Sequence, residues 1–246
     1  MPKSFSARMF VALIVILGLV VFGGAVLNVR SVPTVRFVAF LLAACLAARL
    51  KIKLPGLTGT MSVNLPFILM AAVEMNGAEA LAVGFVSTFV QCLPRGKQKF
   101  SLVQTAFNCS TISLAVAVAR LIDASPSVAL LVHSPALRLA IAAAGYALAN
   151  TVPVAIVIGL TEGVNTLRTW IEMLQLSFPY LVASAGVAGL SLTMGQGIGW
   201  QAPLVVLPVM VGIFQSYRRY FAATATPENS SLPVQAGSRA TAGAHV

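Results

Sequence analysis

The chain has 246 residues, of which 58% are hydrophobic and 9% are charged, and its mean hydropathy is +0.91. Soluble globular domains carry about 25% charged residues, so this composition excludes an ordinary soluble domain. The sixteen Lys and Arg outnumber the six Asp and Glu, and they gather in short clusters between apolar runs. That arrangement argues against a nucleic-acid-binding protein. It predicts a polytopic membrane protein whose basic clusters meet the lipid headgroups of the bilayer.

The first apolar run, Met9–Val29, follows the basic residues Lys3 and Arg8. A basic start, an apolar run and then the small residues Gly23-Gly24-Ala25 fit the outline of a cleaved signal peptide. The run is nevertheless long enough to span a bilayer. We therefore favour an uncleaved first transmembrane helix over a signal peptide.

A second segment is predicted over Pro33–Leu50, and a basic loop rich in Pro and Gly follows it through Thr60. Two apolar segments, Met61–Val73 and Ala80–Leu93, then flank a polar turn around Asn76. Each segment is shorter than the ~20 residues of a full span. They form either two short helices or one re-entrant hairpin, and both alternatives return the chain to the same side of the membrane.

Further spans are predicted at Leu102–Ile122, Pro135–Leu160, Leu174–Met194 and Gln201–Ser216. The predicted fold class is therefore all-α, a polytopic helical membrane bundle of about six to eight transmembrane segments, two of them short or re-entrant. This membrane domain covers residues 1–221. Residues 222–246 are rich in Ala, Thr, Ser and Pro and are predicted to form a disordered cytoplasmic tail.

The orientation of the bundle follows from its basic residues. With eight segments and a cytoplasmic N-terminus, four of the sixteen Lys and Arg fall on the outer side and the other twelve on the cytoplasmic side. The positive-inside rule therefore predicts that both termini are cytoplasmic. The four outer residues are Arg30, Arg36, Arg120 and Arg138.

Polar side chains that interrupt or border the apolar runs are the candidate ligand-binding residues. They could line an outward-opening pocket between helices, because polar groups at membrane depth usually line cavities. For the amides we favour a second interpretation, hydrogen bonding between helices. For the two carboxylates the alternative is exposure to water in an outer loop. The six candidates are Asn64, Glu74, Glu79, Gln104, Asn108 and Asn150.

Chemistry-bearing motifs are missing from the sequence. It contains no nucleophile–base pair, no metal-ligand spacing and no phosphate-binding loop, so we predict a non-enzymatic protein without a metal or other cofactor. Cys45, Cys92 and Cys109 lie in or at the ends of apolar runs. We expect them to be buried structural thiols, because a free cysteine behaves as a small hydrophobic residue.

Turn and packing motifs along residues 33–220 resemble a known family. They are Leu54–Asn64, Val90-Gln91-Cys92, Val103-Gln104 with Phe107-Asn108, Ser177–Val182, Gly199-Trp200-Gln201 leading to Val206–Met210, and Ser216–Tyr220. Together they resemble the N-terminal membrane domains of bacterial signalling proteins that precede GGDEF, HD-type phosphohydrolase or histidine-kinase modules.

The resemblance implies a sensor domain in the bacterial cytoplasmic membrane that passes a conformational change through its last helix. Only the polar tail follows Tyr220, so we expect a stand-alone domain that acts through a cytoplasmic signalling partner. Arg218 and Arg219 would form its cytoplasmic output. The short pair of segments around Asn76-Gly77 is also similar in outline to the vitamin-capturing subunits of energy-coupling transporters. The competing prediction is therefore a component that binds or transports an unidentified small ligand.

Overall fold

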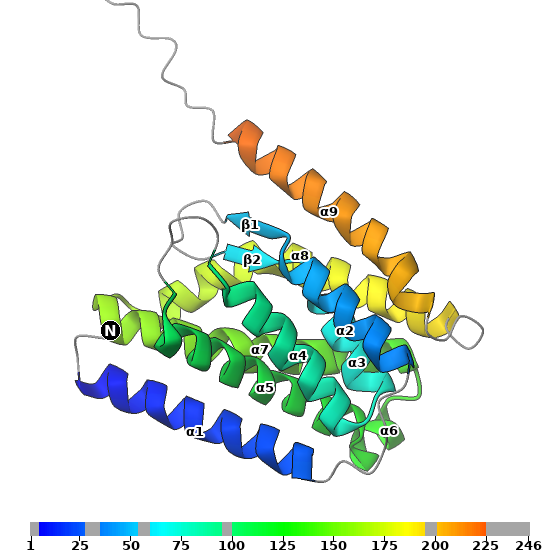
Figure 1. Cartoon of the computed structure of the whole chain (residues 1–246), viewed down its shortest axis with the longest axis horizontal. Helices are drawn as coiled ribbons and strands as arrows, with labels where there is room; N and C mark the ends of the chain where they lie inside the picture. Colours follow the sequence, from blue (N-terminus) through cyan, green and yellow to red (C-terminus); the bar gives the residue numbers. More distant parts are fainter. Residues whose placement is uncertain (1–4, 28–34, 54–59, 95–99, 195–200, 225–246) are drawn as a thin grey trace, which may run out of the picture.

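Helices form most of the chain that the computed structural model describes, which is residues 5–27, 35–53, 60–94, 100–194 and 201–224. The elements in chain order are α1 (Phe5–Leu27), α2 (Val35–Ala48), β1 (Lys51–Lys53), β2 (Thr60–Ser62), α3 (Leu65–Glu74), α4 (Gly77–Cys92), α5 (Leu102–Asp123), α6 (Pro126–Leu131), α7 (Pro135–Glu162), α8 (Thr166–Met194) and α9 (Ala202–Thr224), as Figure 1 shows. The predicted helical bundle is confirmed. The two three-residue strands are an addition to it.

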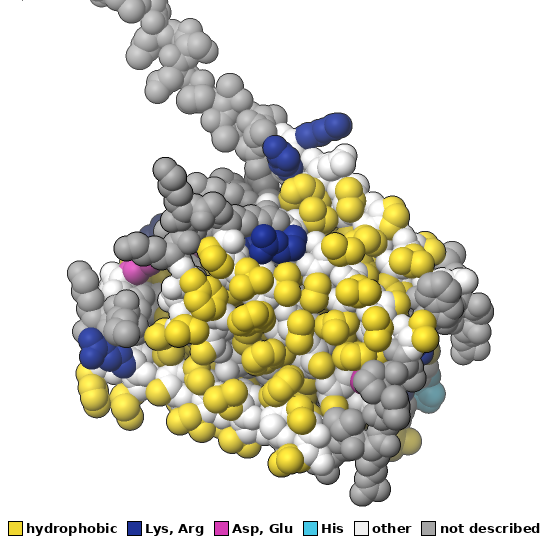
Figure 2. Space-filling model, viewed as in Figure 1, with side chains coloured by type: hydrophobic (Ala, Val, Ile, Leu, Met, Phe, Trp, Pro, Cys, Tyr) yellow, Lys and Arg dark blue, Asp and Glu magenta, His cyan; other side chains and the backbone are white. Residues whose placement is uncertain are grey.

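Four of the described helices, α1, α5, α7 and α8, are long and apolar enough to cross a membrane. The helices α2, α3 and α4 are apolar but shorter. Figure 2 shows hydrophobic side chains covering most of one face of the molecule, and exposed residues such as Leu13, Leu42 and Leu204 belong to different helices. Monomeric soluble proteins rarely expose apolar patches larger than a few hundred Å². The exterior of the bundle therefore suits a lipid environment.

The short helix α3 lies in the middle of the bundle and packs against α2, α4, α5, α7 and α8. Every side chain from Leu65 to Ala72 is buried. A helix of ten residues is about 15 Å long, half the thickness of the hydrocarbon core. Such a short helix is stable at membrane depth only where neighbouring groups satisfy the backbone at both of its ends.

The β1–β2 hairpin replaces part of the predicted loop and the start of the predicted apolar segment at Met61. Lys51–Lys53 pairs antiparallel with Thr60–Ser62, so the helix begins only at Leu65. Pro66 occupies the first turn of α3, where its missing N–H costs nothing and its fixed φ favours the helical start. The predicted apolar segment Met61–Val73 therefore included most of strand β2 as well as helix α3, because hydropathy does not distinguish the two elements.

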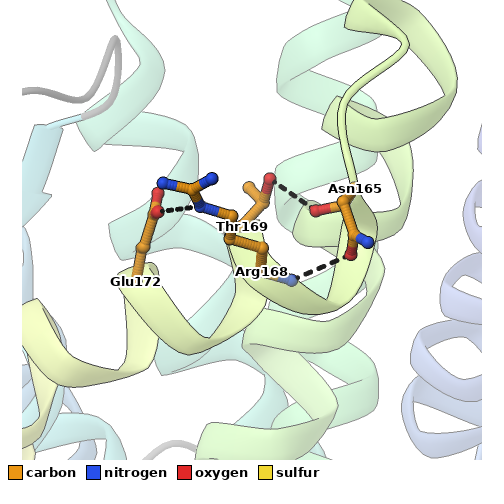
Figure 3. Close-up of polar contacts among 4 residues, drawn as sticks. All are labelled: Asn165, Arg168, Thr169 and Glu172. Carbon is orange, nitrogen blue, oxygen red and sulfur yellow. Dashed lines mark hydrogen bonds and ion pairs between the residues drawn. The ribbon is translucent and has the colours of Figure 1, made fainter.

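The helix α8 begins at Thr166 rather than at the predicted Leu174. Its first turns are polar and are held by local contacts (Figure 3). The backbone N–H of Arg168 donates to Asn165 Oδ1 at 3.1 Å, and Arg168 Nε donates to Glu172 Oε1 at 2.9 Å. Asn165 thus caps the helix, and the extra turns lie in a segment too polar for hydropathy to detect.

The first helix is packed into the bundle along one stripe. Ala7, Val11, Ile14 and Gly18 are its buried residues, and α1 contacts α4, α5 and α7. Phe22 stacks on Phe85 of α4 with ring centroids 4.7 Å apart. The spacing of the stripe matches one face of a helix, so α1 is part of the folded core.

The last helix, α9, lies at the edge of the bundle. It packs mainly against α2, with smaller contacts to α8 and β1 (Figure 1). It extends through Thr224, so the helix enters the predicted tail, whose remaining residues 225–246 lie outside the described part. In Figure 1, α1 runs from left to right and α9 from right to left, so the start of α1 and the end of α9 lie on the same side.

Candidate functional site

The six candidate residues do not converge on one place. Asn64 immediately precedes α3 and Glu74 is its last residue, so the length of the helix, about 15 Å, separates them. Glu79 lies beyond the turn, in the first turn of α4. The structure therefore divides the candidates between the two ends of α3 and four other positions.

A buried hydrogen-bond network surrounds Asn64. Ser62 Oγ donates to Asn64 Oδ1 at 2.7 Å, and Asn64 Nδ2 donates to Ser87 Oγ at 3.1 Å. The Ser87 hydroxyl in turn donates to the Gly84 carbonyl at 3.2 Å. The three polar side chains are all buried. The network therefore joins the end of β2, the start of α3 and the middle of α4.

Tyr180 of α8 completes this end of α3. Its hydroxyl accepts a hydrogen bond from the backbone N–H of Leu65 at 3.2 Å. The first N–H groups of any helix have no partner inside the helix. Here the acceptor for one of these N–H groups is the hydroxyl of a tyrosine that is only 4% exposed. Ser62, Ser87 and Tyr180 were not among the predicted site residues, and nothing in the sequence pairs Leu65 with a residue 115 positions away.

The opposite end of α3 meets two arginines. Arg120 of α5 donates through Nη1 to the Ala72 carbonyl at 2.9 Å and also to the Met75 carbonyl. Arg36 of α2 forms an ion pair with Glu74. The last carbonyls of a helix carry partial negative charge, so cations stabilise this end. The sequence placed Arg36 and Arg120 on the outer side of the membrane, but it did not identify these partners.

Glu79 has a structural role at the start of α4. Its backbone N–H donates to Asn76 Oδ1 at 2.9 Å, and the backbone N–H of Asn76 donates to Glu79 Oε2 at 3.4 Å. This reciprocal pair is a capping box. The sequence Asn76-x-x-Glu79 could have revealed it.

The remaining amides are dispersed. Gln104 is exposed in the first turn of α5, and Asn150 is half-buried on α7. Asn108 Nδ2 lies 3.5 Å from Cys92 Sγ and so joins α5 to α4. Two of the amides, Asn64 and Asn108, thus make contacts between elements, which is the interpretation favoured above for such residues.

The three cysteines are free thiols. Cys109 is buried, as expected, whereas Cys45 and Cys92 are only half-buried. Within the described residues no group of three or more His, Cys, Asp or Glu side chains could hold a metal ion. No protein-family model, curated protein or solved structure matches the chain. The resemblance to signalling membrane domains therefore stays a prediction.

Arg218 and Arg219, the predicted output residues, are exposed near the end of α9. Tyr217 beside them is half-buried and packs against the main hydrophobic core. The two guanidinium groups are therefore presented by a helix that is anchored immediately before them.

Loss of the Asn64 network is expected to loosen the start of α3. Asn64→Ala leaves the Ser62 and Ser87 hydroxyls without their amide partner, which costs about 1–2 kcal/mol of unfolding free energy. In a double-mutant cycle with Ser87→Ala, we expect a coupling energy of about 0.6 kcal/mol, typical of hydrogen bonds between membrane helices. Denaturant unfolding in detergent micelles measures both values. Gln104→Ala, at an exposed amide, is the control and should change stability little; a coupling energy of zero would show that the network is not energetically connected.

Proposed function

We propose that the chain is a non-enzymatic, sensor-type domain of the bacterial cytoplasmic membrane, and that α9 passes its state to a cytoplasmic signalling partner. The observation that carries this proposal is the way α9 is attached. Ala202, Val206 and Met210 are buried along one face of the helix, whereas Leu204 and Val205 are more than half exposed. Positions four residues apart lie on one face, so a single stripe holds α9 to the bundle.

A helix held along one stripe can slide or rotate with little repacking, as in shear motions of packed helices. The contrast with α3 is informative, because α3 is buried on all sides from Leu65 to Ala72. The central helix is thus enclosed on all sides, whereas the peripheral helix is held on one side only. This contrast favours α9 as the moving element.

The helix α2 connects the centre of the bundle to α9. It packs against α3, α4 and α9, and its Arg36 pairs with Glu74 at the end of α3. A change at that end of α3 would therefore act directly on the helix against which α9 packs. This contiguous packing supports a route for a signal from the end of α3 to α9.

The proposed orientation places both ends of the bundle in the cytoplasm. The excess of basic residues in the loops assigned to that side supports it. The opposite direction of α1 and α9 in Figure 1 supports only the placement of both ends on one side. The packing of the stripe from Ala7 to Gly18 into the core supports retention of α1 in the mature protein.

A small-molecule capture or transport component was the competing prediction. It requires Asn64, Glu74 and Glu79 around one cavity. In the structure the length of α3 separates Asn64 from Glu74, and Glu79 is engaged in its capping box. The geometry therefore supports the sensor-type proposal better.

The output assignment is tested by crosslinking in native membranes. A photo-crosslinking residue placed at Gln215, which is exposed on α9, should capture a cytoplasmic protein. The double variant Arg218→Gln/Arg219→Gln, or deletion of residues 225–246, should reduce that capture at least severalfold, because basic side chains position charged partners. Arg168→Gln is the matched control, since Arg168 is also exposed but lies on another helix, in the first turn of α8. If both output variants retain every partner, the output assignment is wrong.

A further inference from the structure

A groove of about 590 Å³ lies between the C-terminal ends of α2 and α4. The groove is open along the outside of the bundle. Its α2 wall carries Leu42 and Leu46, and its α4 wall carries Val90 and Leu93.

The walls of the groove are apolar and face outward. Leu42 and Leu46 are each 60% exposed, and their spacing of four residues places them one above the other on α2. In a bilayer these side chains meet acyl chains rather than water. The groove can therefore receive a hydrocarbon chain from the side.

One end of the groove is cationic. Arg49 follows the end of α2, about one turn beyond Cys45 and Leu46, and like them it lines the groove. Its Nη1 donates to the Val90 carbonyl at 3.3 Å, which holds the guanidinium across the end of the groove. Lys51 follows at the start of β1. None of the described residues that line the groove is acidic.

Through this contact with the Val90 carbonyl, Arg49 also caps the last turn of α4, where the carbonyl groups carry partial negative charge. A guanidinium has five N–H donors in a planar fork, however, and so it can cap a helix and still bind an anion. Phosphodiester oxygens are acceptors that suit this fork. Apolar walls with a cation at one end match an amphiphile with an anionic head.

We propose that this groove binds one anionic phospholipid, with its phosphodiester on Arg49 and an acyl chain along Leu42 and Leu46. The lipid belongs to the leaflet on the side of Lys51, where juxtamembrane basic residues attract anionic headgroups. Figure 2 shows Lys and Arg side chains along the upper left of the hydrophobic face, which fits a boundary between acyl chains and headgroups. None of the described residues that line the groove belongs to α9.

The test compares retention of phosphatidylglycerol and phosphatidylcholine with the same acyl chains. The full chain is reconstituted in nanodiscs of defined mixtures, released into mild detergent, and its bound lipids are counted by native mass spectrometry. The wild type should retain one phosphatidylglycerol in preference to phosphatidylcholine. Arg49→Gln should lower phosphatidylglycerol retention about fivefold or more, because one basic residue near an anionic surface contributes about that factor, and Arg49→Lys should restore part of it.

Two matched variants separate a built site from general attraction. Arg168→Gln removes an exposed positive charge elsewhere and should leave retention unchanged. Leu46→Trp fills the groove with all charges intact and should lower retention, whereas Leu13→Trp, at an exposed position of α1, should not.

The proposal is overturned if Arg49→Gln and Arg168→Gln have the same effect, because the bound lipid is then held by net charge alone. It is also overturned if phosphatidylcholine is retained equally well. Where Arg49→Gln fails to fold because α4 loses its cap, Leu46→Trp decides, and unchanged retention in that variant overturns the proposal. The measurement depends neither on the orientation of the bundle nor on the role of α9.

Discussion

Replacing Gly18 by valine is expected to separate α1 from α5 and to lower the free energy of unfolding by about 1–3 kcal/mol. A Cβ at position 18 would lie 2.4 Å from Cβ and 2.5 Å from Cα of Ser110. The obstacle includes backbone, which cannot rotate away as a long side chain can. Small residues let membrane helices approach this closely, and packing is the main force that joins such helices. Thermal unfolding in detergent, followed by circular dichroism, measures the loss.

The neighbouring Gly23 provides the matched control. It lies on the same helix, and a Cβ built there meets nothing within 4 Å. Gly23→Val should therefore change stability by less than about 0.5 kcal/mol. Gly18→Ala should already be harmful, because the clash involves the first side-chain carbon. Equal melting curves for Gly18→Val and Gly23→Val would mean that α1 is not packed against Ser110 in the membrane.

The long apolar runs made much of the fold predictable. The predicted span Leu102–Ile122 became α5 with its ends almost unchanged, and the span from Pro135 became α7. Such runs can satisfy their backbone in lipid only as helices. The pair of short segments around Asn76 also became two helices, α3 and α4. Hydropathy alone does not decide which of these shorter helices cross the membrane, so the total number of spans stays a prediction.

The elements that the sequence prediction missed are those that contain few apolar residues. The β1–β2 hairpin has only three residues in each strand, and the first turns of α8 are polar because of Asn165, Arg168 and Glu172. Asn165 is a good helix N-cap, and a search for caps rather than for apolar runs would have moved the start of α8 to the correct place.

The candidate site was predictable only residue by residue. Asn64 was singled out as a polar residue at depth, but its partner Ser87 lies 23 positions away. Arg120 lies 48 positions from the carbonyl of Ala72 to which it donates. Such pairs depend on how distant helices pack, and the periodicity of one segment contains no information on its neighbour. Glu74 and Glu79 were grouped because they are close in sequence, yet the end of α3 directs them to different partners.

Replacement of Arg120, the arginine that caps the end of α3, should have the second large effect on stability. Arg120→Met is expected to lower the free energy of unfolding by about 2–4 kcal/mol, because hydrogen bonds from a charged donor contribute more than neutral ones and the carbonyls of Ala72 and Met75 would lose their partner. Ala72 lies in the last turn of the buried helix α3 and Met75 is its C-cap, so water is a poor substitute for the lost partner at this position. Denaturant unfolding measures the loss, and hydrogen exchange should show faster opening at the end of α3.

Arg168→Met is the control for this prediction. The Arg168 side chain is 82% exposed and its partner Glu172 is 50% exposed, so removal of that ion pair should cost less than about 0.5 kcal/mol. Glu74→Gln distinguishes the two arginines at the end of α3, because it weakens the ion pair with Arg36 but keeps the cap from Arg120. Its cost should therefore be smaller than that of Arg120→Met. If Glu74→Gln proves the more damaging of the two, the ion pair rather than the cap holds this end of α3 in place.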